Sequence, residues 1–362
     1  MVEVKKFSSV AAGLPRHLGG VTPPLLQTHR YQTFALDLNP VSKYSLNCTD
    51  LDRASMQIRQ ALRAAIASLR EQNIPSAELA AELLLMYVLG SDRSYLYSHP
   101  ESDLVSDVAE RYSGLIAERG TGKPTQYITG RQEFWGLDFN VTPDVLIPRP
   151  ETEHLVETVL QLAPSPLRGQ GSSADEGARR SESLLRIVDA GTGSGCIALA
   201  LASELSEAQV FATDISRAAL EVARRNAVRL GLADRVRFVE TDLLSGLSAA
   251  AQFDFVVSNP PYVSLDDLDS VQREVREFEP RIAWAGSGEG EAIYRRLFFE
   301  SLRVLGPGGY VVVEVGYNQA GRVLAMLDEN WSNAEVRPDL AGIPRVVMAR
   351  KRAASCPPSV VS

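Results

Sequence analysis

Short and almost wholly apolar runs mark the expected strands of this chain. The clearest is the run Phe253-Asp254-Phe255-Val256-Val257-Ser258. Runs of this length that are apolar on both faces are typical of strands in a parallel sheet covered by helices. An Ala- and Leu-rich helix is predicted over residues 196–205, between two of these runs. Further strands are predicted at residues 186–190, 209–213, 235–240, 308–315 and 345–349. The alternation of strand and helix predicts an α/β fold.

Helical periodicity replaces this pattern over residues 56–118. Apolar residues recur there at three- and four-residue spacing, and Pro75-Ser76 breaks the pattern between the first two stripes. We interpret the stripes as the core of a small helical domain, which is marginal in size for independent folding. The predicted stripes are Ile58, Leu62, Ile66 and Leu69; Leu79, Leu83, Met86 and Tyr87; and Leu104, Val108, Tyr112, Leu115 and Ile116.

The remaining segments divide by composition. Residues 119–148 alternate between apolar and turn-forming residues and predict a linker with a β-hairpin. An α/β domain is expected over residues 149–350, beginning with a helix near Glu151. Residues 163–184 are rich in Ser, Gly, Pro and charge and predict a flexible insertion. Residues 1–55 predict a disordered leader or start-site extension, and residues 351–362 a disordered tail.

Composition and charge narrow the class of protein. The 362 residues carry a net charge of −8, so no global basic field would attract nucleic acid. The three cysteines, Cys48, Cys196 and Cys356, are scattered and indicate neither a disulfide framework nor a metal site. No apolar run reaches transmembrane length. We therefore expect a cytoplasmic protein without metal, and without direct binding to nucleic acid or membrane.

A glycine loop follows the first predicted strand of the α/β part. Gly191, Thr192, Gly193, Ser194 and Gly195 separate that strand from its helix, which lets a ligand approach the backbone and the helix N-terminus. The next strand ends in Asp214, placed to accept hydrogen bonds from ribose hydroxyls. Asp242 and Leu243 follow the third strand, where an adenine would lie. The same glycines also fit a dinucleotide pattern, so a nicotinamide enzyme is the alternative at this point.

Asn259-Pro260-Pro261-Tyr262 follows the most apolar strand. Two prolines cannot donate to a strand ladder, so the strand must end there. The tetrapeptide then holds an amide and an aromatic ring on a stiff turn at the carboxyl end of a strand, where ligands bind in open α/β sheets. The position and the stiffness predict a binding site for a polar, planar group.

Several stretches together resemble one family, the release factor glutamine methyltransferases, also called PrmC or HemK. The similarity covers about residues 56–350, and the Pro-Arg-Pro-Glu-Thr-Glu run is its most specific part. It implies a Rossmann-like sheet of the class I S-adenosylmethionine-dependent methyltransferases, with an antiparallel last strand. The stretches that carry it are 122–124, 126–128, 147–153 (Ile-Pro-Arg-Pro-Glu-Thr-Glu), 189–195 (Asp-Ala-Gly-Thr-Gly-Ser-Gly) and 259–262.

The resemblance implies methyl transfer to the side-chain amide of the glutamine in the Gly-Gly-Gln motif of class I peptide chain release factors. Gly191 to Gly195, Asp214, Asp242, Leu243 and Asn259 would bind S-adenosylmethionine, and residues 259–262 the glutamine. The Asn259 oxygen and the Pro260 carbonyl would accept the two amide hydrogens, while Tyr262 would pack against the target side chain. We expect a monomer. The alternatives are a methyltransferase of exocyclic base amines, because the acceptor pair is the same, and a non-catalytic adaptor of the translation machinery.

Overall fold

The protein was analysed as a computed structural model. The structure describes residues 56–164, 184–264, 268–269, 271–286 and 291–353. The expected leader, almost all of the expected insertion and most of the expected tail therefore lie outside the described residues. Lys351, which was assigned to the tail, instead ends the last strand of the sheet.

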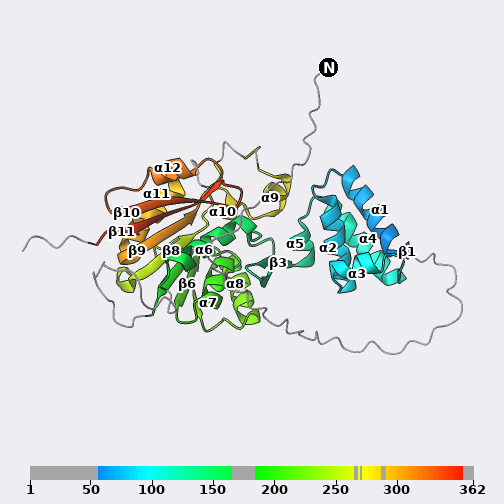
Figure 1. Ribbon diagram of the computed structural model, residues 1–362, viewed down its shortest axis with the longest axis horizontal. Coiled ribbons are helices and arrows are strands. Elements are labelled where there is room, and N and C mark those ends of the chain that lie inside the picture. The colour runs from blue at the N-terminus through cyan, green and yellow to red at the C-terminus, as the bar shows by residue number, and fades with distance from the viewer. Residues whose placement is uncertain (1–55, 165–183, 265–267, 270, 287–290, 354–362) are drawn as a thin grey trace, which may run out of the picture. The chain divides into compact units, whose positions relative to one another are not determined.

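A seven-stranded sheet forms the α/β part (Figure 1). Its order is β10-β11-β9-β8-β5-β6-β7, and β11 pairs antiparallel with both of its neighbours while the pairs from β9 to β7 are parallel. The antiparallel last strand is thus confirmed, whereas β10 was not predicted. The strands are β5 (Arg186–Ala190), β6 (Gln209–Asp214), β7 (Val236–Glu240), β8 (Phe253–Ser258), β9 (Leu305–Glu314), β10 (Trp331–Pro338) and β11 (Pro344–Lys351).

Helices cover both faces of this sheet (Figure 1). Ile187, Val210 and Val257 pack in one buried cluster with α6, α7 and α8, while the neighbouring Val188 and Val256 belong to a second cluster with α11 and α12. Successive residues of a strand point to opposite faces, so one apolar run serves two cores. The helices of this part are η1 (Pro150–Thr152), α6 (Glu153–Leu162), α7 (Cys196–Glu204), α8 (Arg217–Arg229), η2 (Ala249–Ala251), α9 (Arg273–Phe278), α10 (Arg281–Trp284), α11 (Ala292–Val304) and α12 (Ala320–Leu324).

The N-terminal described segment is helical and has its own core. Ile58, Leu69, Tyr112 and Ile116 are buried there, as the first and third stripes predict. Leu104 is buried too, but it lies in a two-residue strand and not in a helix. The elements are β1 (Met56–Gln57), α1 (Ile58–Glu71), α2 (Ala77–Leu89), α3 (Arg93–Ser98), β2 (Asp103–Leu104) and α4 (Ser106–Gly120).

The predicted apolar stripe of α2 is wrong at two of its members. Leu79 and Tyr87 are exposed, whereas Met86 packs against the core, and the fully buried residues are others, including Ala81, Leu84 and Leu85. Nearly every residue of this helix is apolar, so periodicity alone does not single out one face. The alanines let the neighbouring helices approach closely, which decides the orientation.

The predicted hairpin is present but shorter than expected. It consists of β3 (Arg131–Phe134) and β4 (Leu137–Asn140), joined through Trp135 and Gly136. Both joining residues have positive φ, 55° and 70°, as a tight hairpin turn requires. The stretch before it, which was included in the hairpin, forms the helical turn α5 (Thr125–Thr129) between Pro124 and a left-handed Gly130.

The burial of α2 leads to a stability prediction. Leu85→Ala should lower the free energy of unfolding by about 2–5 kcal/mol, because it leaves a cavity in the helical core. Leu79→Ala, on a side chain that is 45% exposed, should change it by less than about 0.5 kcal/mol. Urea unfolding measures the free-energy change of each variant, provided that the dependence of the free energy of unfolding on urea concentration (the m value) stays the same. Equal losses would show that the helix is rotated relative to this description.

Candidate active site

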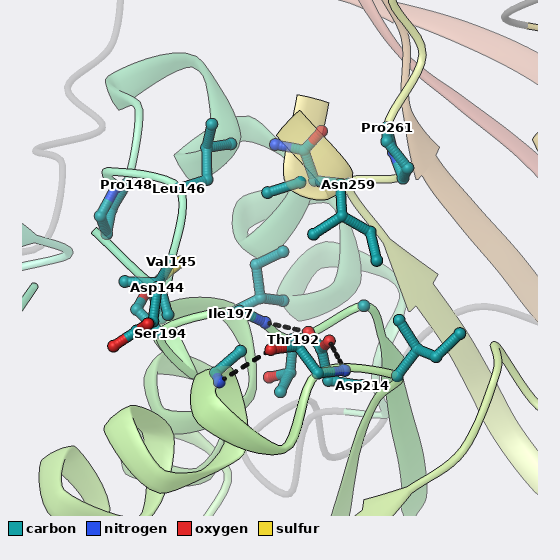
Figure 2. Close-up of a pocket in the computed structure, with 18 of the residues that line it drawn as sticks. Asp144, Val145, Leu146, Pro148, Thr192, Ser194, Ile197, Asp214, Asn259 and Pro261 are labelled. Carbon is teal, nitrogen blue, oxygen red and sulfur yellow. Dashed lines mark hydrogen bonds between the residues drawn. The ribbon is translucent and has the colours of Figure 1, made fainter. Parts of the chain in front are cut away.

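A cavity of about 310 Å³ lies at the carboxyl edge of the parallel strands (Figure 2). The chain runs outward from β5 to β6 and β7 and then returns to β8 on the other side of β5. Ligands bind in open α/β sheets at such a reversal, beyond the carboxyl ends of the strands. The loops after β5, β6, β7 and β8 all contribute to the lining, and residues 144–146 and 148–149 close the cavity from another side.

The glycine loop presents its backbone to this cavity. Gly191 and Gly193 line it with φ of 74° and 55°, and a Cβ on either would meet nothing within 4 Å. Side chains would therefore project into open space that the bare backbone leaves for a ligand. Gly195 is not among the lining residues. A Cβ there would approach Ala223 and Leu199 at 3.1 Å, so Gly195 allows α7 to pack closely beside α8.

Asp214 links the glycine loop to the second strand. Its Oδ2 accepts a hydrogen bond from the Gly193 backbone at 2.9 Å, and its Oδ1 accepts one from Ser216 at 2.8 Å. Burial raises the pKa of the carboxyl, and these backbone donors act in the opposite direction. Each oxygen retains a second lone pair. The residue can therefore hold the loop and still accept a ligand hydroxyl from the cavity that it lines.

Asp242 and Leu243, where the adenine is expected, also line the cavity. Leu243 has a φ of 48° and its carbonyl accepts a hydrogen bond from the Thr213 hydroxyl at 2.8 Å. A non-glycine residue with positive φ is uncommon, and such backbone often occurs at ligand sites. The Asp242 carboxylate bonds to Arg296 at 2.9 Å. This ion pair limits the freedom of the carboxylate toward a ligand.

The tetrapeptide divides between two cavities that meet at Asn259. Asn259 lines both, Pro261 lines the first, and Pro260 and Tyr262 line a second cavity of about 720 Å³. Figure 2 shows Asn259 and Asp214 on opposite sides of the first cavity. Asn259 shares this position between the two cavities with Leu146, Arg149 and Ala283, and it is the member of the tetrapeptide that borders both. This division was not foreseen from the sequence.

Contacts from the loop between β9 and α12 fix the Tyr262 turn. The Gln319 side chain donates to the Tyr262 carbonyl at 3.0 Å, and the same side chain accepts a hydrogen bond from the Gly316 backbone at 3.1 Å. A Cβ on Gly316 would meet the Tyr262 ring at 2.9 Å. Burial raises the pKa of Tyr262, so the phenol stays neutral. The ring is therefore held as a neutral wall of the second cavity.

The Pro-Arg-Pro-Glu-Thr-Glu run makes two contacts with buried glutamates that the sequence did not identify. Arg149 forms an ion pair with Glu279, whose side chain is only 1% exposed and which also accepts a hydrogen bond from the Ile147 backbone at 3.1 Å. Arg149 is therefore not a free surface charge. Thr152 is buried and contacts Asn259 and the buried Glu314. Neither Thr152 nor Glu314 was predicted as a site residue, although Thr152 belongs to the run singled out as most specific.

Family models match two parts of the chain: residues 60–130 match the PrmC N-terminal domain and residues 180–277 the methyltransferase small domain. A release factor glutamine methyltransferase of Koribacter versatilis is 47% identical over 82% of this chain and 99% of its own length. One of Geobacter sulfurreducens is 40% identical over 81% and 96%. A methyltransferase from Pyrococcus furiosus has a TM-score of 0.41 at 19% identity, over 60% of this chain and 90% of its own.

The strand order, the glycine loop and the small-domain match define a Rossmann-like methyltransferase. The extent and identity of the relatives go further: the chain belongs to the release factor glutamine methyltransferases. The predicted family, fold class and enzyme class are thereby confirmed. Among the described residues, no helix is long and apolar enough to cross a membrane.

The buried ion pair leads to a pH-dependent prediction. Arg149→Met should destabilise the protein by about 3 kcal/mol near pH 8, because Glu279 would remain buried without its cation. Burial already raises the pKa of Glu279, and Arg149 lowers it. Removing Arg149 should therefore raise the pKa of Glu279 further. A carboxyl with a raised folded pKa costs stability above its unfolded pKa, so the deficit should grow as the pH rises above about 5.

Urea unfolding of the variant and the wild type from pH 4.5 to 8 measures this deficit. Arg59→Met, which breaks the exposed pair with Glu101, is the control and should cost less than about 1 kcal/mol at every pH. A deficit of Arg149→Met that is flat with pH would contradict the assignment.

Proposed function

We propose that this chain transfers the methyl group of S-adenosylmethionine to the side-chain amide nitrogen of the Gly-Gly-Gln glutamine in class I release factors. The observation that supports it most is the meeting of two cavities at Asn259, in a chain that belongs to this enzyme family. The first cavity would take the cofactor, and the second would admit the glutamine.

The residues of the first cavity fit the proposed cofactor. The side-chain-free backbone of Gly191 and Gly193 leaves room for it, and Asp214 offers an acceptor for its ribose hydroxyls. Asp242 and Leu243 would border its adenine. When bound, S-adenosylmethionine supplies an electrophilic methyl group on a sulfonium. This chain's own residues would then have to hold the acceptor nitrogen in line with that methyl group.

Asn259 and Pro260 would position the acceptor. An amide nitrogen is a weak nucleophile because its lone pair is delocalised, and it carries two hydrogens. The Asn259 oxygen and the Pro260 carbonyl can each accept one, which favours the positive charge that develops on nitrogen during attack. Neither group is a base at neutral pH, so the proton would leave to water afterwards. Tyr262 would pack against the target side chain from the wall of the second cavity.

Base amines offer the same two hydrogens, so they are the alternative acceptors. The relatives that match most of this chain are named release factor glutamine methyltransferases, which does not favour methyl transfer to base amines. We further propose that the helical segment 56–118 recognises the protein substrate. The loops of the first cavity all lie outside that segment.

A methyl-transfer assay tests the acceptor. With tritiated cofactor, the wild type should label a purified class I release factor and should not label tRNA, rRNA or DNA. A release factor in which the Gly-Gly-Gln glutamine is replaced by alanine is the matched control and should take up no label. Label on a nucleic acid, or unchanged label on the control factor, would contradict the proposal.

Asn259→Ala tests the role of the amide. The acceptor interaction matters most in the transition state, so turnover should fall by about a hundredfold or more, while substrate affinity falls much less. Asn259→Asp keeps an acceptor oxygen and should retain more activity than Ala. Single-turnover methyl transfer by folded protein measures both. A wild-type rate in Asn259→Ala would remove Asn259 from the catalytic residues.

A further inference from the structure

A chain of hydrogen bonds runs from the partly buried Asn259 into the core of the sheet. The Thr152 hydroxyl donates to Oε2 of Glu314 at 2.6 Å, and Nδ2 of Asn259 donates to the Thr152 oxygen at 3.1 Å. Thr152 and Glu314 are 2% and 3% exposed. These three residues come from η1, from the end of β9 and from the loop after β8, so the contacts join segments far apart in the sequence.

The direction of these bonds determines which atom of Asn259 a ligand meets. A threonine hydroxyl has one hydrogen, and Thr152 donates it in the hydrogen bond to Glu314. The Thr152 oxygen can then only accept, so it bonds to the amide nitrogen of Asn259 and would repel the amide oxygen. With Nδ2 committed to Thr152, Oδ1 is the amide atom left to accept a hydrogen from a ligand. In the reverse orientation the Asn259 NH2 group would face the substrate nitrogen, which carries two hydrogens of its own, and no hydrogen bond could form between them.

We propose that Thr152 and Glu314 are positioning residues that hold the Asn259 amide with its oxygen toward the acceptor nitrogen. The inference rests on the proposed function, because it concerns how that function's acceptor is held. It also gives a role to the threonine of the Pro-Arg-Pro-Glu-Thr-Glu run. Both residues act through Asn259 and not on the acceptor itself.

The protonation state of Glu314 sets the direction of the chain. Burial is the main cause that raises the pKa of Glu314, to about 7, and the Thr152 hydrogen bond opposes it. Protonated Glu314 can itself donate to Thr152, which frees the threonine proton and removes the preference at Asn259. Turnover should therefore fall as the pH falls through about 7. The other titratable groups that interact electrostatically with Glu314 in one of their protonation states are Arg149, Glu151, Cys196, Tyr262, Tyr294 and Arg345.

Thr152→Val is the first test, because it keeps the shape and removes the hydroxyl. Turnover on the release factor should fall by about tenfold or more, while the Michaelis constant and cofactor affinity stay within about threefold of wild type. Thr152→Ser restores the hydroxyl and should recover turnover. Thr158→Val is the matched control: Thr158 is equally buried on α6, but it donates only to His154 of its own helix, at 2.7 Å. Its kinetics should not change.

The pH profile separates positioning from mere support of the fold. Glu314→Gln should lower turnover and abolish its decline below pH 7, because an amide does not titrate there. Normal turnover in folded Thr152→Val, or an unchanged acid limb in Glu314→Gln, would overturn the inference while leaving the proposed function intact. Absence of methyl transfer to the release factor by wild type would instead contradict the proposed function.

The inference can also be tested by a measurement that needs no methyl-accepting substrate, which is required if the wild type does not methylate the release factor. In protein labelled with nitrogen-15 at asparagine, the Asn259 side-chain amide is identified as the resonance lost in Asn259→Ala. Its hydrogens should exchange slowly with solvent in the wild type and in Thr152→Ser, and at least about tenfold faster in Thr152→Val. Equal exchange in all three would overturn the inference whatever the acceptor is.

Discussion

The reversal of strand order between β5 and β8 is the constraint on which the site depends. Because these strands are adjacent and parallel, with Val188 opposite Val256, their carboxyl ends lie side by side. The glycine loop and Asn259 therefore meet, although nearly 70 residues separate them. The Ser258 hydroxyl, which donates to the Ala190 carbonyl at 2.7 Å, joins the two ends directly. Every other site residue is placed relative to this pair of strand ends.

Buried polar groups then hold the loops that this reversal brings together. Asp214 bonds the glycine loop, Glu279 bonds residues 147 and 149, and Glu314 reaches Asn259 through Thr152. Burial raises the pKa of each of these three carboxyls. An unsatisfied buried carboxylate is costly, so each requires its partners in place. Each buried carboxyl therefore favours the loop conformation in which its hydrogen-bond partners are in place, and this fixes the loops around both cavities.

The sequence predicted those parts of the fold and site that local pattern determines. Apolar runs located β5, β6, β8 and β11, and they placed Asp214 at the end of one strand and Asn259 directly after another. The pattern failed where tertiary packing decides between locally equivalent choices. In α2 nearly every position is apolar, so only packing against other helices selects Leu85 over Leu79. Thr125–Thr129 is rich in β-branched residues yet forms a helical turn, because Pro124 and Gly130 bound it.

The contacts of Arg149 and Thr152 could not be predicted for a different reason. Their partners lie 130 and 162 residues further along the chain, and no local spacing relates residues at such separations. What the sequence does carry is an unusual density of rigid and polar residues in the Pro-Arg-Pro-Glu-Thr-Glu run. Proline restricts the backbone before and after Arg149, which lowers the entropy lost when its neighbours bond across the fold. A stiff, polar run beside a helix start thus indicates long-range partners without identifying them. Here Arg149 reaches the buried Glu279, and Thr152 reaches Glu314, which borders the second cavity.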